Sequence, residues 1–227
     1  MSRPPNPVPD RVLIGLALAL ATGCASITSG QRPETLGKGR VEVGVETAYQ
    51  AALEPDTVLA FPIMSATTRV GVSERVDLGG RASTSGLGVQ TKVLLHRGAR
   101  LTVSIAPRSD WVHAFEDGVG FDTFETAMPA LSSFRVHDGL ELLASGRLHS
   151  STVAVKYSDT YWAHTLGIGG SGGVAVRTGK MWLVTELGLL YPFLITGKPA
   201  DEMGGTTTRL DRIVAQLSFT VLFGGSR

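Results

Sequence analysis

Few residues of this chain could carry chemistry, and their spacing limits which chemistry is open to them. Five histidines are spread along the 227 residues, namely His96, His113, His137, His149 and His164. None of them forms the pair at positions i and i+4 with a glutamate that a zinc protease uses. We therefore predict no metal site and no cofactor.

One histidine lies among acidic residues. His113 is close in sequence to Asp110, Glu116 and Asp117, within a stretch from Arg108 to Phe124 that we predict to be a long loop. A histidine that contacts carboxylates can serve as a general base. Such a cluster in a loop is more often solvated surface, so we predict that the protein is not an enzyme.

A glycine-rich stretch could be mistaken for a phosphate-binding loop. Residues Gly167–Gly173 have the sequence GIGGSGG, but no lysine and no predicted helix follow them. A phosphate-binding loop needs both. The alternation within the stretch favours a strand that bends or packs closely against its neighbours.

The lone cysteine, Cys24, follows an apolar run of signal-peptide length, Val12–Ala21, and the small residues Thr22 and Gly23. This arrangement resembles the lipobox of bacterial lipoproteins. The resemblance implies cleavage before Cys24, a diacylglycerol on its thiol, and sorting to the outer membrane. We therefore predict a signal peptide over residues 1–23 and a polar tether over residues 24–38.

From residue 39 to residue 227 the chain alternates apolar and polar residues in about ten stretches, which predicts an all-β domain. The expected strands cover Arg40–Tyr49, Ala60–Val72, Val76–Ser83, Gly88–Leu95, Leu101–Pro107, a less clear segment that ends near Val136, Leu140–Arg147, His164–Arg177, Met181–Leu190 and Ile213–Phe223. Short turns are expected at Ser73–Arg75, His96–Arg100, His137–Gly139 and Gly179–Lys180. Longer loops are expected at Arg108–Phe124, Leu148–Trp162 and Thr196–Arg209.

Short turns that alternate with longer loops are typical of transmembrane β-barrels, whose short turns face the periplasm. The last strand, with Phe219 and Phe223 on one face, resembles the closing strand of bacterial outer-membrane barrels. The resemblance implies an antiparallel up-and-down transmembrane β-barrel with about ten strands. A lipid on Cys24 would then tether the N-terminus at the periplasmic leaflet.

The alternation leaves open which face is inside. A lipocalin-like barrel would bind an apolar ligand within, whereas a membrane barrel turns its apolar face to lipid. We favour the membrane barrel because the polar face combines small residues with charges of both signs, which suits a narrow lumen. These charges are Glu42, Glu46, Arg69, Asp77, Arg81, Lys92, Arg135, Glu141, Arg147, Arg177 and Glu186.

The mixed charges predict a largely plugged lumen and a structural or interaction role. Arg135 and Glu141 are expected to pair across one hairpin. A small channel and a rim-active hydrolase, as in barrel proteases and lipid A-modifying enzymes, remain alternatives. A net charge of +1 without a basic run argues against nucleic acid as a partner. The expected partners are outer-membrane lipids and the barrel-assembly and lipoprotein-sorting machinery.

The lipobox resemblance gives a first prediction. The mature N-terminal peptide should begin at Cys24 and carry the mass of a diacylglycerol and a further acyl chain. Mass spectrometry of that peptide checks this result. A free thiol at Cys24, or cleavage at another position, would contradict the lipoprotein prediction.

Overall fold

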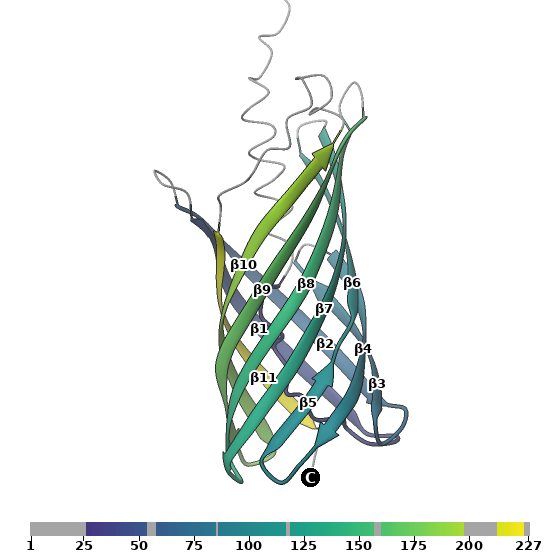
Figure 1. Cartoon of the computed structure of the whole chain (residues 1–227). Coiled ribbons are helices and arrows are strands. Elements are labelled where there is room, and N and C mark those ends of the chain that lie inside the picture. The colour runs from purple at the N-terminus through teal and green to yellow at the C-terminus, as the bar shows by residue number, and fades with distance from the viewer. Residues whose placement is uncertain are drawn as a thin grey trace, which may run out of the picture.

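The computed structural model describes residues 26–53, 58–84, 86–116, 119–156, 160–197 and 213–224. Within them the chain folds into one antiparallel sheet that closes on itself as a barrel (Figure 1). The strands are β1 (Val41–Leu53), β2 (Val58–Gly71), β3 (Val76–Ser83), β4 (Gly86–Arg97), β5 (Leu101–Ile105), β6 (Arg108–Glu116), β7 (Val119–His137), β8 (Leu140–Lys156), β9 (Thr160–Thr178), β10 (Met181–Gly197) and β11 (Ile213–Gly224). The all-β class is confirmed.

The barrel has ten strand positions, because β5 and β6 share one of them. Both pair with β4 on one side and with β7 on the other. β5 lies near the end that carries the turns 72–75, 98–100, 138–139 and 179–180, which we call the short-turn end, and β6 lies towards the opposite end. Ala106 and Pro107 join them, and Pro107 cannot donate a ladder hydrogen bond, so the strand is interrupted there. The first strand pairs with the last, from Glu42 opposite Gly224 to Leu53 opposite Ile213, and this pairing closes the barrel.

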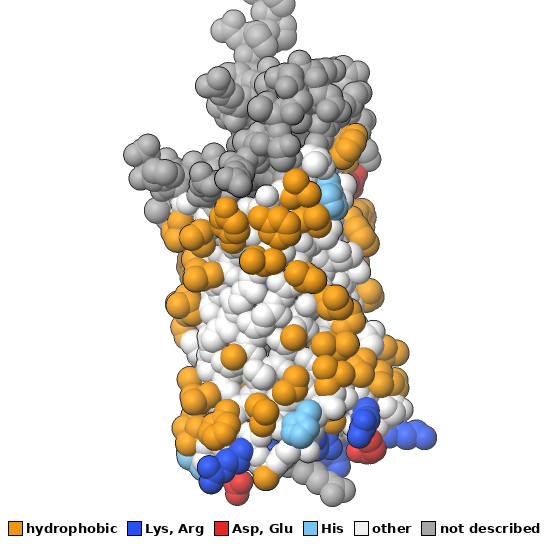
Figure 2. Space-filling model, in the orientation of Figure 1, with side chains coloured by type: hydrophobic (Ala, Val, Ile, Leu, Met, Phe, Trp, Pro, Cys, Tyr) orange, Lys and Arg blue, Asp and Glu red, His pale blue; other side chains and the backbone are white. Residues whose placement is uncertain are grey.

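The outer surface is apolar and the interior is polar. On β11 the side chains of Leu217 and Phe219 are exposed, whereas those of Gln216, Ser218 and Thr220 are at most 3% exposed. The other strands repeat the pattern, and Figure 2 shows apolar side chains towards both ends and along the edges of the outer face in view, around a central white area. This facing is that of a transmembrane barrel. It excludes the lipocalin-like alternative, whose apolar side chains would line the interior.

Two predicted loops are wrong. The segments Arg108–Phe124 and Leu148–Trp162 belong almost entirely to strands, with only residues 117–118 and 157–159 outside the description. As a result β7 and β9 are 19 residues long and β8 and β10 are 17, which exceeds the 9–11 residues that a strand needs to cross a bilayer. In Figure 1 these strands rise beyond their neighbours at the end opposite the short turns.

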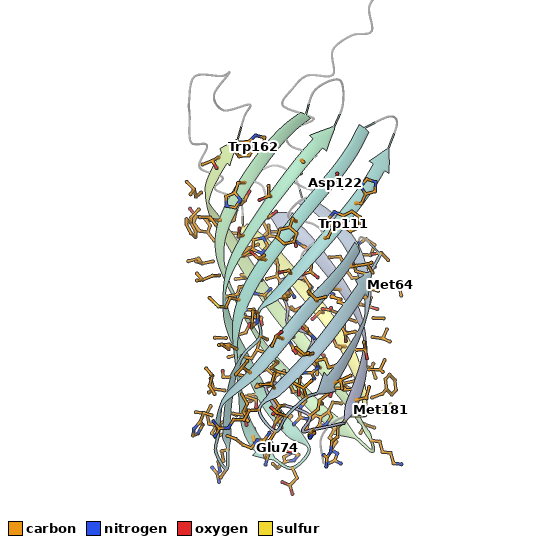
Figure 3. The ribbon with its side chains drawn as sticks, turned by 90° about the vertical axis from the view of Figure 1, so that its right-hand side faces the viewer. Met64, Glu74, Trp111, Asp122, Trp162 and Met181 are labelled. Carbon is orange, nitrogen blue, oxygen red and sulfur yellow. The ribbon has the colours of Figure 1, made fainter. Side chains whose placement is uncertain are left out.

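The outer face has different residues at its two ends. Tyr49, Trp162 and Tyr191 are all exposed on the outer face. Figure 3 places Trp111 and Trp162 towards the long-strand end and Glu74 at the short-turn end. Aromatic rings at that level suit a headgroup region. No helix among the described residues is long and apolar enough to cross a membrane.

The segment that we predicted as a polar tether lies inside the barrel. Ser26 to Gly37 are buried, except for Ser29, which is half-buried, and their partners are inward-facing side chains of the wall. Cys24 itself lies outside the described residues. The difference has a physical reason: a narrow lumen with unpaired charges is costly, and a polar segment can supply partners for them.

The facing of β11 gives a second prediction. Phe219→Arg should lower the free energy of unfolding in lipid vesicles by about 2–4 kcal/mol, because Phe219 faces lipid near the middle of its strand. Phe223→Arg, the same change at the short-turn end, should cost about 0–1 kcal/mol. Urea titration followed by tryptophan fluorescence measures both. Equal costs for the two variants would contradict the facing or the depth assigned to Phe219.

Candidate functional site

The candidate site is the lumen together with the segment Ser26–Gly37, which we call the lumen segment. It begins beside Glu46 and Arg147, near the middle of β1 and β8, and ends beside Glu74 at the turn between β2 and β3. β1 follows directly and lies in the wall around it. The first strand of the barrel therefore fixes where the segment enters, and the inward side chains fix its path.

Arg32 has the strongest set of contacts in the segment. Its Nη2 and Nε donate to the two carboxylate oxygens of Glu141 at 2.7 and 3.0 Å, and Nη2 also lies 2.9 Å from Glu34. Its guanidinium carbon is 3.6 Å from the centre of the Trp182 ring. Arg32 is 4% exposed. A bidentate ion pair with a cation–π contact fixes both the position and the orientation of the side chain.

Two further carboxylates of the wall bind the first half of the segment. Glu186 accepts hydrogen bonds from the backbone N–H of Gly30 at 2.7 Å and from the Ser29 hydroxyl at 3.0 Å. Glu46 accepts from the hydroxyls of Ser26 and Thr28 at 3.1 and 3.0 Å. These carboxylates therefore accept hydrogen bonds from the segment in addition to those from wall residues such as Ser171 and Ser65.

The second half of the segment is held by a cation and a carboxylate from neighbouring strands. Lys92 Nζ donates to the carbonyls of Arg32 and Glu34 at 2.7 and 2.8 Å. Asp77, directly opposite Lys92 in the register of β3 and β4, accepts from the Leu36 N–H at 3.0 Å. Both wall residues are 1% exposed. The wall therefore recognises backbone groups here rather than particular side chains.

One apolar contact seats the start of the segment. Ile27 is 1% exposed and clusters with Leu190 and Val214, which are inward residues of β10 and β11. Gly188 makes room for it, because a Cβ built on Gly188 would lie 2.9 Å from Ile27 Cγ2. A side chain at position 188 would therefore displace the segment.

Little space is left between the segment and the wall. A cavity of about 20 Å³ lies between Ser29–Gln31 and the wall residues Glu46, Arg69 and Arg108. That volume holds roughly one water molecule. Arg108, which lines this cavity, and Arg147 both donate to the carbonyl oxygen of Ser26, Arg147 at 2.8 Å. This part of the lumen is therefore filled by protein rather than by a wide aqueous path.

The structure assigns partners to most of the predicted lumen charges. Glu42 pairs with Arg69, Glu46 with Arg81 at 3.1 Å, and Asp77 lies 3.7 Å from both Arg69 and Lys92. Glu141, Glu186 and Arg147 contact the lumen segment instead. Pairing across the lumen was expected, but the segment supplies many of the partners.

Two of the predicted lumen residues lie at the short-turn end. Arg135 is opposite Glu141 in the register, as predicted, with Nε 3.9 Å from the carboxylate, but its side chain is 43% exposed. It is closer to Glu34, at 3.3 Å. Arg177 is exposed and donates to the carbonyl of Gly179, so it does not join the lumen network.

Sequence reasoning missed several inward residues. Arg32 and Glu34 were assigned to a tether, and Arg108, Asp110 and Glu125 to a loop or to an unclear strand. Arg108 lies 3.5 Å from Asp110, and Glu125 is 2% exposed. For the wall residues, alternation continuing past Pro107 was an available signal. The lumen segment gives no such signal, because its sequence has neither the two-residue period of a strand nor the 3.6-residue period of a helix.

Of the candidate catalytic cluster, the structure describes the side chains of Asp110 and His113, and these lie on opposite faces of the wall. Asp110 faces the lumen beside Arg108, whereas His113 is exposed on the outer face and pairs with Asp122 at 2.8 Å. Asp117 lies outside the described residues. The stretch Gly167–Gly173 is part of strand β9, as predicted, and a Cβ on Gly173 would lie 2.2 Å from the Thr185 carbonyl. Among the described residues no group of three or more His, Cys, Asp or Glu could hold a metal ion.

Comparison with known proteins adds barrels of low similarity. No protein-family model matches the chain. No curated protein matches it either. Among solved structures, Neisserial surface protein A is 13% identical with a TM-score of 0.44, covering 81% of this chain and 96% of that one. The translocator domain of the autotransporter NalP from Neisseria meningitidis is 10% identical with a TM-score of 0.44, covering 96% of each chain. The outer membrane protease OmpT from Escherichia coli is 8% identical with a TM-score of 0.42, covering 82% of this chain and 94% of that one.

The Arg32 contacts give a third prediction. Glu141→Ala should lower the free energy of unfolding by about 3–5 kcal/mol, because it leaves Arg32 buried with one partner carboxylate removed. Ser145→Ala, on the same strand as Glu141, removes one hydrogen bond to Ser171 of β9 and should cost about 1 kcal/mol. Chemical unfolding in vesicles measures both variants.

A double-mutant cycle with Arg32→Ala separates this contact from general damage to β8. The combined variant should lose less than the sum of the single losses, because both removed charges belong to one pair. Strict additivity would show that Arg32 and Glu141 do not interact, and would place the segment elsewhere.

Proposed function

We propose that this chain is a bacterial outer-membrane β-barrel with a structural or interaction role, whose lumen is closed by its own N-terminal segment. The apolar outer face supports the membrane placement. Such a barrel relies on the barrel-assembly machinery for insertion. Its role is non-enzymatic in this proposal, since Asp110 and His113 lie on opposite faces of the wall.

The observation that carries the proposal is the set of contacts around Arg32. When a guanidinium that pairs with Glu141 and stacks on Trp182 leaves the lumen, the buried carboxylate of Glu141 loses its bidentate partner. Lys92 and Glu186 hold the backbone on either side of it. These contacts favour a closed lumen over a permanently open channel.

The predicted lipid on Cys24 belongs to the proposal, and the position of Ser26 constrains it. Ser26 contacts Glu46 and Arg147 near the middle of the barrel wall. Two residues of extended chain span at most about 7 Å. Half the thickness of a bilayer core is roughly 15 Å. A lipid in the periplasmic leaflet therefore requires the start of the segment to leave the lumen, so anchoring and closure compete within one molecule.

Single-channel recording in planar bilayers tests closure and gives the fourth prediction. Protein with Cys24→Ser, which cannot be lipidated, should show no large, stable conductance. Removal of residues 26–37, or Arg32→Glu, should produce openings, because Arg32→Glu places like charges beside Glu141. Lys38→Glu makes the same charge change at an exposed residue and should leave the barrel closed.

The competing function is a small channel. Large, stable conductance from the unlipidated protein, equal to that of the variant without residues 26–37, would defeat closure and favour the channel. Peptide or lipid hydrolysis that is lost in His113→Ala would instead favour a rim-active hydrolase.

A further inference from the structure

Basic side chains gather at the short-turn end of the barrel. Those exposed or half-exposed there form what we call the basic ring: Lys38, Arg40, Arg75, Arg97, Arg100, Arg135, Arg177 and Lys180. Among the described residues the exposed acidic side chains at this end are those of Glu74 and Asp138. Figure 2 shows blue side chains clustered at the lower end of the molecule. The net charge of the whole chain is only +1, so this end is strongly positive against a neutral average.

The ring borders the lipid-facing surface directly. Arg100 precedes Leu101, Arg135 precedes Val136, and Val176 precedes Arg177, with the three apolar side chains 42–49% exposed on the outer face. In a barrel that spans a bilayer, the level just beyond the apolar surface is the headgroup region. The cations therefore lie at the level of the lipid phosphates, although Arg97 and Arg135 also donate to Thr35 and Glu34 of the lumen segment.

The ring surrounds the barrel instead of marking one side. Its members come from the entry to β1 and from the turns β2–β3, β4–β5, β7–β8 and β9–β10. A folded protein partner would contact one sector of such a circle. An annulus of lipid contacts every sector, so a complete ring of cations favours lipid as the partner.

We propose that the basic ring binds the phosphate groups of anionic phospholipids in the leaflet at the short-turn end. Arginine donates pairs of parallel hydrogen bonds to phosphate oxygens, and each Lys or Arg near an anionic surface adds about 1 kcal/mol of attraction. Zwitterionic lipids carry no net charge to attract. The ring therefore selects lipids with a net negative headgroup, of the class of phosphatidylglycerol. This inference rests on the membrane placement in the proposed function.

The test uses nanodiscs that contain phosphatidylglycerol and phosphatidylcholine in equal amounts, with native mass spectrometry of the lipids that stay bound on release. The unaltered protein should retain phosphatidylglycerol in excess. The variant Arg75→Gln, Arg100→Gln, Lys180→Gln removes three ring cations, and its excess should fall several-fold. High salt during preparation should lower the excess of phosphatidylglycerol bound to the unaltered protein. This second test does not depend on the folding of any variant.

A matched control carries Lys198→Gln, Arg209→Gln and Arg212→Gln, which remove the same charge from the connection between β10 and β11. Its lipid ratio should equal that of the unaltered protein. Equal ratios for the ring variant and the unaltered protein would overturn the inference. Ring-dependent binding of soluble polyglutamate without any lipid preference would also overturn it, by pointing to an acidic polymer. Failure of the protein to form a folded, heat-modifiable barrel in nanodiscs would instead count against the membrane placement.

Discussion

The ion pair between Arg32 and Glu141 is the contact on which the closed lumen depends. Glu141 is 1% exposed, and a carboxylate so buried needs a partner that the wall around it supplies only in part, through Arg135 at 3.9 Å. The lumen segment brings that partner together with backbone groups for Lys92, Asp77 and Glu186. A barrel that turns its apolar residues to lipid leaves polar residues inside, and the segment supplies hydrogen-bond partners for several of them.

The same division of residues explains the two ends of the molecule. In the middle, the described outward side chains carry no charge and most are apolar. At the short-turn end, which we place at the lipid headgroups, the exposed side chains include the cations of the basic ring. At the other end β7 to β10 continue past the length needed to cross a bilayer, and their outer face carries Trp111, His113 and Asp122 (Figure 3). The closed lumen and the charged rim are thus consequences of one amphipathic pattern.

Alternation predicted the strands best where one face meets lipid. The facing of Gln216 to Phe219 and the short turns at His137–Gly139 and Gly179–Lys180 follow from it. It failed at Arg108–Phe124 and Leu148–Trp162, because above the membrane the outer face carries polar residues such as His113 and the inner face apolar ones such as Val112 and Val153. The lumen segment could not be found this way, since it has no regular secondary structure and its hydrogen-bond partners in the wall are 18 to 190 residues distant in sequence.

Accessibility of the lumen segment to a membrane-impermeant maleimide tests the central claim most directly. In a Cys24→Ser background, one protein carries Gln31→Cys, at a buried position beside Arg69, and a second carries Lys38→Cys, at an exposed position seven residues later. When the folded barrels are labelled in permeabilised vesicles, the cysteine at position 38 should react fast and the cysteine at position 31 should be strongly protected. Unfolding should remove that protection. Equal, fast labelling at both positions would show that the segment lies outside the lumen and would contradict the account.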